Sequence, residues 1–215
     1  MLFLSYFSRV KSEGSDNIVS IPGRGKVRKI SIKGDGNSIT SKSILDSMRI
    51  SIIGDRNRVY IAENTSLMND TIHIGTDDCP VCECSLIIGQ DSKSNGSTIM
   101  MLEDKSVIEI GRDCSFAAGA QIWCTDSHSM LDTNNCVTNR GRYIKIGDHV
   151  WCGLDVKIGK NVIIADNCMV GWGSIVTKSF EENNVLIAGN PAKIVKTNIC
   201  WDLARPNVLL KKAEH

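Results

Sequence analysis

The sequence predicts an all-β chain wound as a solenoid of short parallel strands, and three observations support this. Apolar residues recur every six positions in the C-terminal half, starting at Ile146. Isoleucine and valine are frequent, whereas the 215 residues include only four Phe, four Trp and three Tyr. The period is interrupted once, between residues 126 and 145. A helix repeats near 3.6 residues and a strand near 2, so a period of six indicates a short strand plus a turn in each repeat.

The bulk composition excludes several classes of protein. The net charge of +1 argues against a globally basic nucleic-acid binder, so no nucleic-acid partner is expected. No run of 18 apolar residues is present, so no transmembrane span is expected. At this length we expect one domain with small appendages. The predicted parts are an irregular N-terminal segment 1–27, a repeat domain 28–195 with an extruded loop 126–145, and a tail 196–215.

The N-terminus and the cysteines predict a cytoplasmic protein. Residues 1–10 are apolar but lack the basic start and cleavage site of a signal peptide, which leaves open a packed end or one that touches the inner membrane. Nine cysteines at irregular spacing fit reduced thiols. Cys79, Cys82 and Cys84 could form half a zinc site, but no second Cys/His pair with ligand spacing accompanies them. We therefore expect no metal.

The repeats are visible in two places. Residues 30–39 read ISIKGDGNSI and residues 50–59 read ISIIGDRNRV, which predicts two successive coils twenty residues apart. From Ile146 the hexads read IGDHVW, CGLDVK, IGKNVI, IADNCM, VGWGSI and VTKSFE. The leading apolar residues are expected to stack inward, while the adjacent Gly or Ala and the following Asn or Asp serve tight turns. His149 occupies a turn position and is expected to be exposed.

The break in the repeat is the predicted functional loop. Asn134-Asn135 and Asn139-Arg140-Gly141 are turn signals, so residues 126–145 should project from the solenoid. Loops held on a rigid scaffold often carry function. This loop contains His128, which alone would be interpreted as a surface histidine, together with the basic residues Arg140, Arg142 and Lys145.

The tandem [Ile/Leu/Val]-Gly hexads resemble the hexapeptide-repeat acyltransferases, and the resemblance covers most of residues 50–195. It implies a left-handed parallel β-helix, which general topology rules would not predict. At three hexads per coil, residues 28–190 would form about seven or eight coils. Three further motifs are similar to the family: Thr125-Asp126-Ser127-His128 resembles its D-x-H loop entrance, residues 146–153 its I-G-x-x-V-W-I-G block, and residues 188–193 its A-G-x-P-A-K ending.

The resemblance implies acetyl transfer from acetyl-CoA, with His128 as the general base. Trp151 would pack against the acetyl or pantetheine arm or position the acceptor, and a backbone amide near Gly153 and Leu154 would stabilise the oxyanion. The group that orients His128 stays open between Asp126, Asp132 and a backbone carbonyl. A covalent route through Cys124 is a less favoured alternative. The residues implied to line the coenzyme A cleft are Trp151, Gly171, Trp172, Gly173, Thr177, Lys178, Ala188, Pro191 and Lys193.

Two basic clusters suggest an anionic acceptor. They comprise Arg24, Lys26, Arg28 and Lys29 before the repeats, and Arg140, Arg142 and Lys145 in the loop. A bare β-helix resembles the O-acetyltransferases of bacterial surface polysaccharides, so the expected acceptor is a sugar hydroxyl of capsular polysialic acid. Family likeness also implies a homotrimer with sites between subunits. Alternatives are a small sugar, nucleotide sugar or amino acid acceptor, and a zinc carbonic anhydrase, which the wide spacing of His73, His128 and His149 disfavours.

Overall fold

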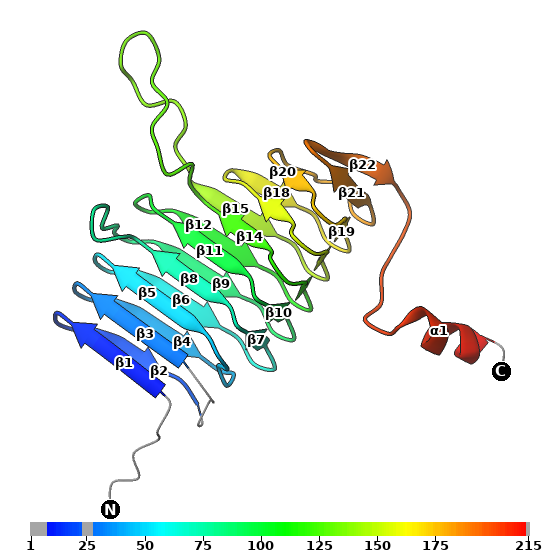
Figure 1. Cartoon of the computed structure of the whole chain (residues 1–215), viewed down its shortest axis with the longest axis horizontal. Helices are drawn as coiled ribbons and strands as arrows, with labels where there is room; N and C mark the ends of the chain where they lie inside the picture. Colours follow the sequence, from blue (N-terminus) through cyan, green and yellow to red (C-terminus); the bar gives the residue numbers. More distant parts are fainter. Residues whose placement is uncertain (1–7, 23–27, 214–215) are drawn as a thin grey trace, which may run out of the picture.

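The computed structural model describes residues 8–22 and 28–213. The chain winds through eight coils whose strands form three parallel sheets of eight, seven and seven strands (Figure 1). The predicted solenoid is therefore correct: seven coils begin from β3 onward, within the predicted seven or eight for residues 28–190, and one further coil precedes them. The first sheet contains β1 (Ser8–Glu13), β3 (Arg28–Lys33), β5 (Arg49–Ile53), β8 (Thr71–Ile74), β11 (Thr98–Met101), β14 (Gln121–Trp123), β17 (Lys157–Ile158) and β20 (Ile175–Val176).

The other two sheets complete each coil. The second sheet contains β2 (Ile18–Ser20), β4 (Ser38–Ser41), β6 (Arg58–Ile61), β9 (Ser85–Ile88), β12 (Val107–Ile110), β15 (Tyr143–Ile146) and β18 (Val162–Ile164). The third contains β7 (Ser66–Met68), β10 (Lys93–Asn95), β13 (Ser115–Phe116), β16 (Trp151–Cys152), β19 (Met169–Val170), β21 (Leu186–Gly189) and β22 (Ala192–Lys196). Among the strands of the described residues, only β22 runs antiparallel to its neighbour, β21.

The core consists of columns of apolar side chains stacked in register along the solenoid. In the first sheet each inward residue lies beside the equivalent residue of the next coil, as the repeat predicts. The narrow interior accepts one medium-sized side chain per strand at these positions, which accounts for the few aromatics. This buried column is formed by Ile30, Ile50, Ile72, Ile99, Ile122, Ile158 and Val176.

The coils begin earlier than the sequence predicts. β1 pairs with β3 and β2 pairs with β4, although both strands lie in the segment 1–27 that was expected to be irregular. The physical link is an asparagine ladder: Asn37 Nδ2 donates to Asn17 Oδ1 over 3.1 Å, and Asn57 Nδ2 donates to Asn37 Oδ1 over 3.1 Å. Asn17 thus repeats the twenty-residue spacing of the next two coils. Residues 1–7 and the basic residues Arg24 and Lys26 lie outside the described residues.

The bounds of the extruded loop and of the tail also differ slightly from the prediction. The extruded loop, residues 124–142, projects from the solenoid between β14 and β15 (Figure 1). It ends before Tyr143 because Tyr143–Ile146 form β15, which pairs with β12. After β22 the chain leaves the solenoid as residues 197–205 and ends in α1 (Pro206–Ala213). No helix within residues 8–22 and 28–213 is long and apolar enough to cross a membrane.

Candidate active site

His128 lies on a loop whose base is held by a polar network. The Asp126 carboxylate accepts hydrogen bonds from the Lys160 ammonium and from Asn139 Nδ2, the latter over 2.8 Å. The same Asn139 nitrogen donates to the His128 carbonyl oxygen over 2.8 Å, and Asn139 Oδ1 accepts from the Met130 amide over 2.8 Å. Asn139 is only 8% exposed. The backbone on both sides of His128 is therefore fixed.

Both carboxylates considered as orienting groups for His128 have other partners. The hydrogen bond from Lys160 is the main cause that lowers the pKa of the Asp126 carboxyl below its usual value, against a partial opposing effect of burial. Asp132 accepts the amides of Asn134 and Cys136, over 2.8 and 2.9 Å, and so shapes the loop tip. Among the described residues, neither carboxylate bonds to the His128 ring.

The His128 cavity is an open hollow of about 370 Å³ at the base of the loop. Its volume falls within the range that holds small ligands. His128 is exposed on its wall, so the imidazole is accessible from the cavity. Besides His128, the lining residues are Cys79, Leu102, Glu103, Asp104, Thr125, Ser127, Ser129, Val137, Asn139 and Arg140.

The structure argues against a covalent route through Cys124. This side chain is 0% exposed, in the core beneath the loop. Burial raises the pKa of its thiol to about 12, so the thiol is protonated at neutral pH. A nucleophilic cysteine needs the opposite environment, an exposed thiol with a lowered pKa. The alternative weighed from the sequence is therefore wrong.

The predicted basic cluster of the loop is divided in the structure. Arg140 lines the His128 cavity, and together with Arg142, Asp104 and Lys105 it lines an adjoining hollow of about 240 Å³. Arg140 Nε lies 4.0 Å from Glu103 Oε2. Lys145 lies instead on β15, exposed and in register with Glu109 on β12. Only the two arginines therefore stand at the cavities.

The predicted coenzyme-binding residues lie mostly on another side of the solenoid. Trp151 is on β16 in the third sheet and is 38% exposed. Trp172 follows β19 and is 73% exposed, and beside it Gly173 has φ +64 with open space where a side chain would be. Ala188, Pro191 and Lys193 belong to the β21–β22 hairpin, where Ala188 lies against Gly171. Thr177 and Lys178 are exposed between the first and second sheets, at the same corner as the loop.

The structure corrects the expected oxyanion donor. The Gly153 amide donates to the Val170 carbonyl over 2.8 Å as part of the ladder between coils, so this amide is not available to a substrate. A parallel coil uses nearly every strand-end amide in this way. Gly153 has a different role, because any side chain there would collide with the Trp172 indole. Of the predicted pair, only the Leu154 amide remains for an oxyanion.

One chain does not bring the predicted base and the predicted coenzyme wall together. The His128 loop projects from the corner between the first and second sheets, whereas Trp151 lies on the third sheet. Trp151 lines a different cavity of about 650 Å³ beneath the C-terminal segment (residues 197–205) and α1, and this cavity shares no residue with the His128 cavity. The two halves of the site therefore face different sides of the solenoid.

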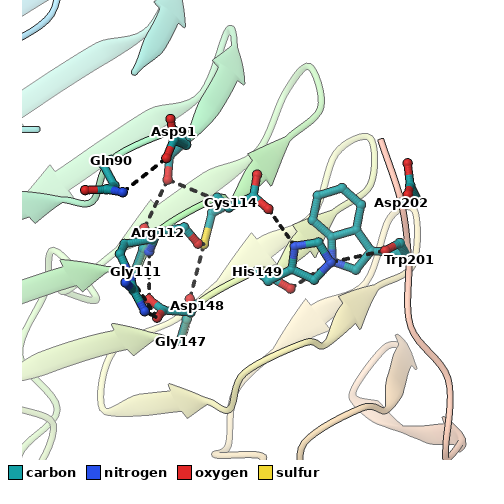
Figure 2. Close-up of polar contacts among 12 residues, drawn as sticks. Gln90, Asp91, Gly111, Arg112, Cys114, Gly147, Asp148, His149, Trp201 and Asp202 are labelled. Atoms are coloured by element: carbon teal, nitrogen blue, oxygen red, sulfur yellow. Dashed lines mark hydrogen bonds and ion pairs between the residues drawn. The ribbon is translucent and has the colours of Figure 1, made fainter. Parts of the chain in front are cut away.

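The C-terminal segment contains a site residue that sequence reasoning missed. The Trp201 ring lies 6.1 Å from that of Trp151, centroid to centroid, and it stacks on His149 at 4.3 Å (Figure 2). His149 is thus half-buried, not exposed as its turn position predicted. The contact joins residues 52 positions apart, so no local pattern could indicate it. The available signal was a lone tryptophan after the last repeat in an aromatic-poor chain.

The cysteine cluster does not converge on a common point. Cys84 is buried and accepts from the Ser106 hydroxyl over 3.4 Å, while Cys79 is exposed and lines the His128 cavity. In the part of the chain that the structure describes, no group of three His, Cys, Asp or Glu side chains could hold a metal ion.

Comparison with known proteins supports the family resemblance. The chain is 36% identical over 181 residues to the polysialic acid O-acetyltransferase of Neisseria meningitidis, covering 76% of this chain and 84% of that protein. It is 32% identical over 117 residues to the polysialic acid O-acetyltransferase of Escherichia coli O1:K1, covering 54% of this chain and 38% of that protein. No model of a protein family matches the sequence.

Solved structures agree with the sequence relatives. The polySia-specific acetyltransferase NeuO superposes with a TM-score of 0.83 at 26% identity, covering 96% of this chain and 98% of that one. The polysialic acid O-acetyltransferase OatWY superposes with a TM-score of 0.70 at 30% identity, covering 92% of each chain. The three-sheet solenoid matches their left-handed β-helix. The chain therefore belongs to the hexapeptide-repeat acetyltransferase family and is an acyltransferase.

Proposed function

We propose that the chain transfers an acetyl group from acetyl-CoA to a hydroxyl group of polysialic acid. The observation that carries the proposal is the placement of His128, exposed on a braced loop at the wall of a cavity with Arg140 on its rim. Relatives named for the same reaction, over most of the chain, support it. The same proposal places the protein in the cytoplasm, where acetyl-CoA is made.

His128 acts as the general base in this mechanism. Its neutral imidazole takes the proton of the acceptor hydroxyl, and the oxygen attacks the carbonyl carbon of the acetyl thioester. The tetrahedral oxyanion accepts a hydrogen bond from a backbone amide, for which Leu154 is the candidate. When the C–S bond breaks, the proton on His128 passes to the leaving thiolate, giving the O-acetyl sugar and coenzyme A. No covalent enzyme intermediate is needed, which agrees with the buried Cys124.

The acetyl-CoA wall comes from a neighbouring subunit. His128 and Trp151 lie on different sides of one chain, so a complete site requires a second copy. Closed rings of identical chains place one side of each copy against another side of the next. In a homotrimer of this kind, the loop of one subunit would meet the Trp151 and Trp172 face of its neighbour at each of three equivalent interfaces.

The residues of that wall suit coenzyme A. The exposed Trp172 indole offers a flat apolar surface, and the open space beside Gly173 leaves room for a pantetheine arm. Lys193 on the same side and Lys178 at the corner that carries the loop are exposed and can meet the phosphates as point charges. Ala188 and Pro191 would complete the wall, and Thr177 would contribute beside Lys178 from the loop corner.

The acceptor would lie along the two adjoining hollows at the base of the loop. Polysialic acid carries one carboxylate per sugar, so a line of cations next to the base suits it better than a neutral sugar. Arg140 and Arg142 stand in this position, with Lys105 beside them. The carboxylates Glu103 and Asp104 also line the cavity, where they can accept hydrogen bonds from sugar hydroxyls.

The test is thiol release from acetyl-CoA in the presence of a panel of acceptors. We expect release with polysialic acid, weak release with neutral oligosaccharides, and a loss of a hundredfold or more in His128→Ala. His73→Gln, a histidine change on the first sheet away from the loop, is the matched control and should remain active. Exclusive acetylation of amines, small sugars or nucleotide sugars would overturn the proposed acceptor, and an active His128→Ala would overturn the proposed base.

A further inference from the structure

The corner between the second and third sheets carries a row of left-handed turn residues, one in each of six successive coils. Asn and Asp tolerate this backbone conformation because their short side chains bond locally. Five of the six positions in this row are Asn or Asp, and the sixth is His149, with φ 55. The turn does not require an imidazole, so the side chain of His149 has another use. The five others are Asn64, Asp91, Asp113, Asn167 and Asn184.

The imidazole of His149 connects this row to the C-terminal segment. Its Nδ1 lies 2.8 Å from Asp113 Oδ2, and its Nε2 lies 3.1 Å from the Trp201 carbonyl oxygen. The indole of Trp201 stacks on the ring at an interplanar angle of 11° and donates from Nε1 to the His149 carbonyl over 2.8 Å (Figure 2). The three residues form a closed set of contacts, which we call the latch.

Both ring nitrogens of His149 face acceptors. A neutral imidazole has one N–H, so it can satisfy either the Asp113 carboxylate or the Trp201 carbonyl while its lone pair opposes the other. An imidazolium donates to both, and its bond to the carboxylate is charge-assisted. The latch is therefore complete only when His149 carries a proton.

The other charged groups around His149 are mostly occupied. Asp148, on the same turn, pairs with Arg112 at 2.6 Å. Asp166, on the next turn, accepts the Asp148 amide over 2.7 Å. On the C-terminal segment, Asp202 Oδ1 accepts the Ala204 amide over 2.6 Å, and Arg205 lies at the cavity beneath the segment. Asp113 is thus the carboxylate that meets the imidazole directly.

A second tie, independent of protonation, holds the same segment. The Ile199 amide donates to the Asn184 carbonyl over 3.0 Å, and Asn184 Nδ2 donates to the Ile199 carbonyl over 3.2 Å. The segment is thus attached at two positions of the row, one neutral and one titratable. Between them and α1 lies the cavity of about 650 Å³ that contains Trp151.

We propose that Asp113, His149 and Trp201 form a proton-dependent latch that makes Trp201 a positioning residue for Trp151. The positioning role rests on the proposed function, in which Trp151 contacts acetyl-CoA. When His149 loses its proton, one of the two ring contacts is lost. The segment then remains attached through Asn184, the ring stack and the Trp201 indole N–H, but Trp201 is held less firmly against Trp151.

Hydrogen exchange of the full chain, without substrates, tests the latch itself. The Trp201 indole N–H donates to the His149 carbonyl, and its protection, corrected for the intrinsic rate at each pH, should fall about tenfold between pH 5.5 and 8.5, as expected for loss of one charge-assisted bond. Amides of β11 in the solenoid core serve as the internal control and should not change. Protection that is independent of pH would overturn the proposal.

His149→Asn is the matched variant, because Asn167 and Asn184 occupy the equivalent positions of the next two coils with the same backbone conformation. It should fold normally and show low, pH-independent protection of the Trp201 indole N–H. Asp113→Asn removes the carboxylate charge and should reduce the pH dependence. If His149→Asn retains the wild-type dependence on pH, another group causes that dependence and the proposed latch is wrong.

The positioning role is tested by the pH profile of acyl transfer. His128 must be neutral to act as a base, so activity should rise with pH, while opening of the latch should give a falling limb in kcat/KM for acetyl-CoA. His149→Asn should lose this falling limb and raise the KM for acetyl-CoA severalfold at pH 6, with the KM for the acceptor unchanged. A profile identical to wild type would exclude the positioning role. If wild type releases no thiol with any acceptor, the proposed function fails, whereas the exchange result still decides the latch.

Discussion

The side-chain amide of Asn139 donates to the backbone carbonyl oxygen of His128 over 2.8 Å. The same amide also donates to Asp126, and Asp126 accepts from Lys160 of the next coil. The backbone of His128 is therefore held relative to the solenoid itself, and not only to the loop. A general base has to be held within a fraction of an ångström of the hydroxyl that it deprotonates. The loop is long, but at its base it is anchored.

Asn139→Ala should therefore impair catalysis by releasing the backbone of His128. We expect kcat to fall between about ten- and a hundredfold, because His128 is no longer held in a fixed position at the cavity wall. Steady-state kinetics with saturating acetyl-CoA measures this. Asp132→Ala is the control, since Asp132 bonds only to amides at the loop tip, and it should keep near wild-type turnover. Equal losses in both variants would mean that general loop disorder is responsible.

The anchor should also weaken in acid. The pKa of Asp126 is lowered in the folded chain, chiefly by Lys160, so its contribution is present above the unfolded value of about 3.9 and is lost as pH falls through the folded pKa. Hydrogen exchange of residues 126–139 should therefore increase, relative to intrinsic rates, below about pH 4. In Asp126→Asn the same segment should be loosened already at neutral pH. A segment that stays equally protected at pH 3 would show that the ion pair does not hold the loop.

The two arginines at the loop base should determine affinity for an anionic polymer. Arg140→Ala and Arg142→Ala should each raise the KM for polysialic acid several-fold with little change in kcat, and the effect should diminish at high salt. Lys145→Ala is the matched control, because Lys145 lies on the sheet beside Glu109 and outside both hollows. A larger effect of Lys145→Ala would place the polymer across β15 instead.

Cys124→Ala should leave acyl transfer within about twofold of wild type, because its buried, protonated thiol takes no part in direct transfer. The variant removes a small buried group, so a modest loss of stability of about 1 kcal/mol is expected. Thiol-release rates at a temperature well below unfolding separate the two effects. An inactive but folded variant would require a covalent acyl-enzyme.

Much of the solenoid follows from the sequence because each coil repeats one physical requirement. Inward Ile and Val residues, with Gly, Asn or Asp at the turns, recur at regular spacing in the sequence. In the structure they stack in register, from Ile30 in the first sheet to Val176. The first coil was not predicted because β1 contributes mostly polar and charged residues, although Gly14 and Asn17 repeat the spacing of Gly34 and Asn37.

The site was less predictable, since its contacts are not local. His128, Arg140 and Trp151 could be selected from motifs and from the break in the period. The Gly153 amide donates to the Val170 carbonyl because coils are linked by backbone hydrogen bonds. The hexad pattern alone does not show these bonds. The stacking of Trp201 on His149 joins the tail to a turn far earlier in the chain. Neither motif nor period contains such information.

The separation of His128 from Trp151 leads to the most decisive prediction, which concerns assembly. His128→Ala lacks the base, and Trp151→Ala lacks part of the coenzyme wall, so each should be inactive alone. If every site takes its base from one subunit and its wall from the next, trimers reassembled from an equal mixture should contain intact sites. Random assembly gives a quarter of sites with both wild-type residues, so the mixture should recover about 25% of wild-type activity. Light scattering should show a trimer, and the same mixture left without dissociation and reassembly is the control. Two inactive variants that fail to complement in verified mixed trimers would locate both residues in a site within one chain.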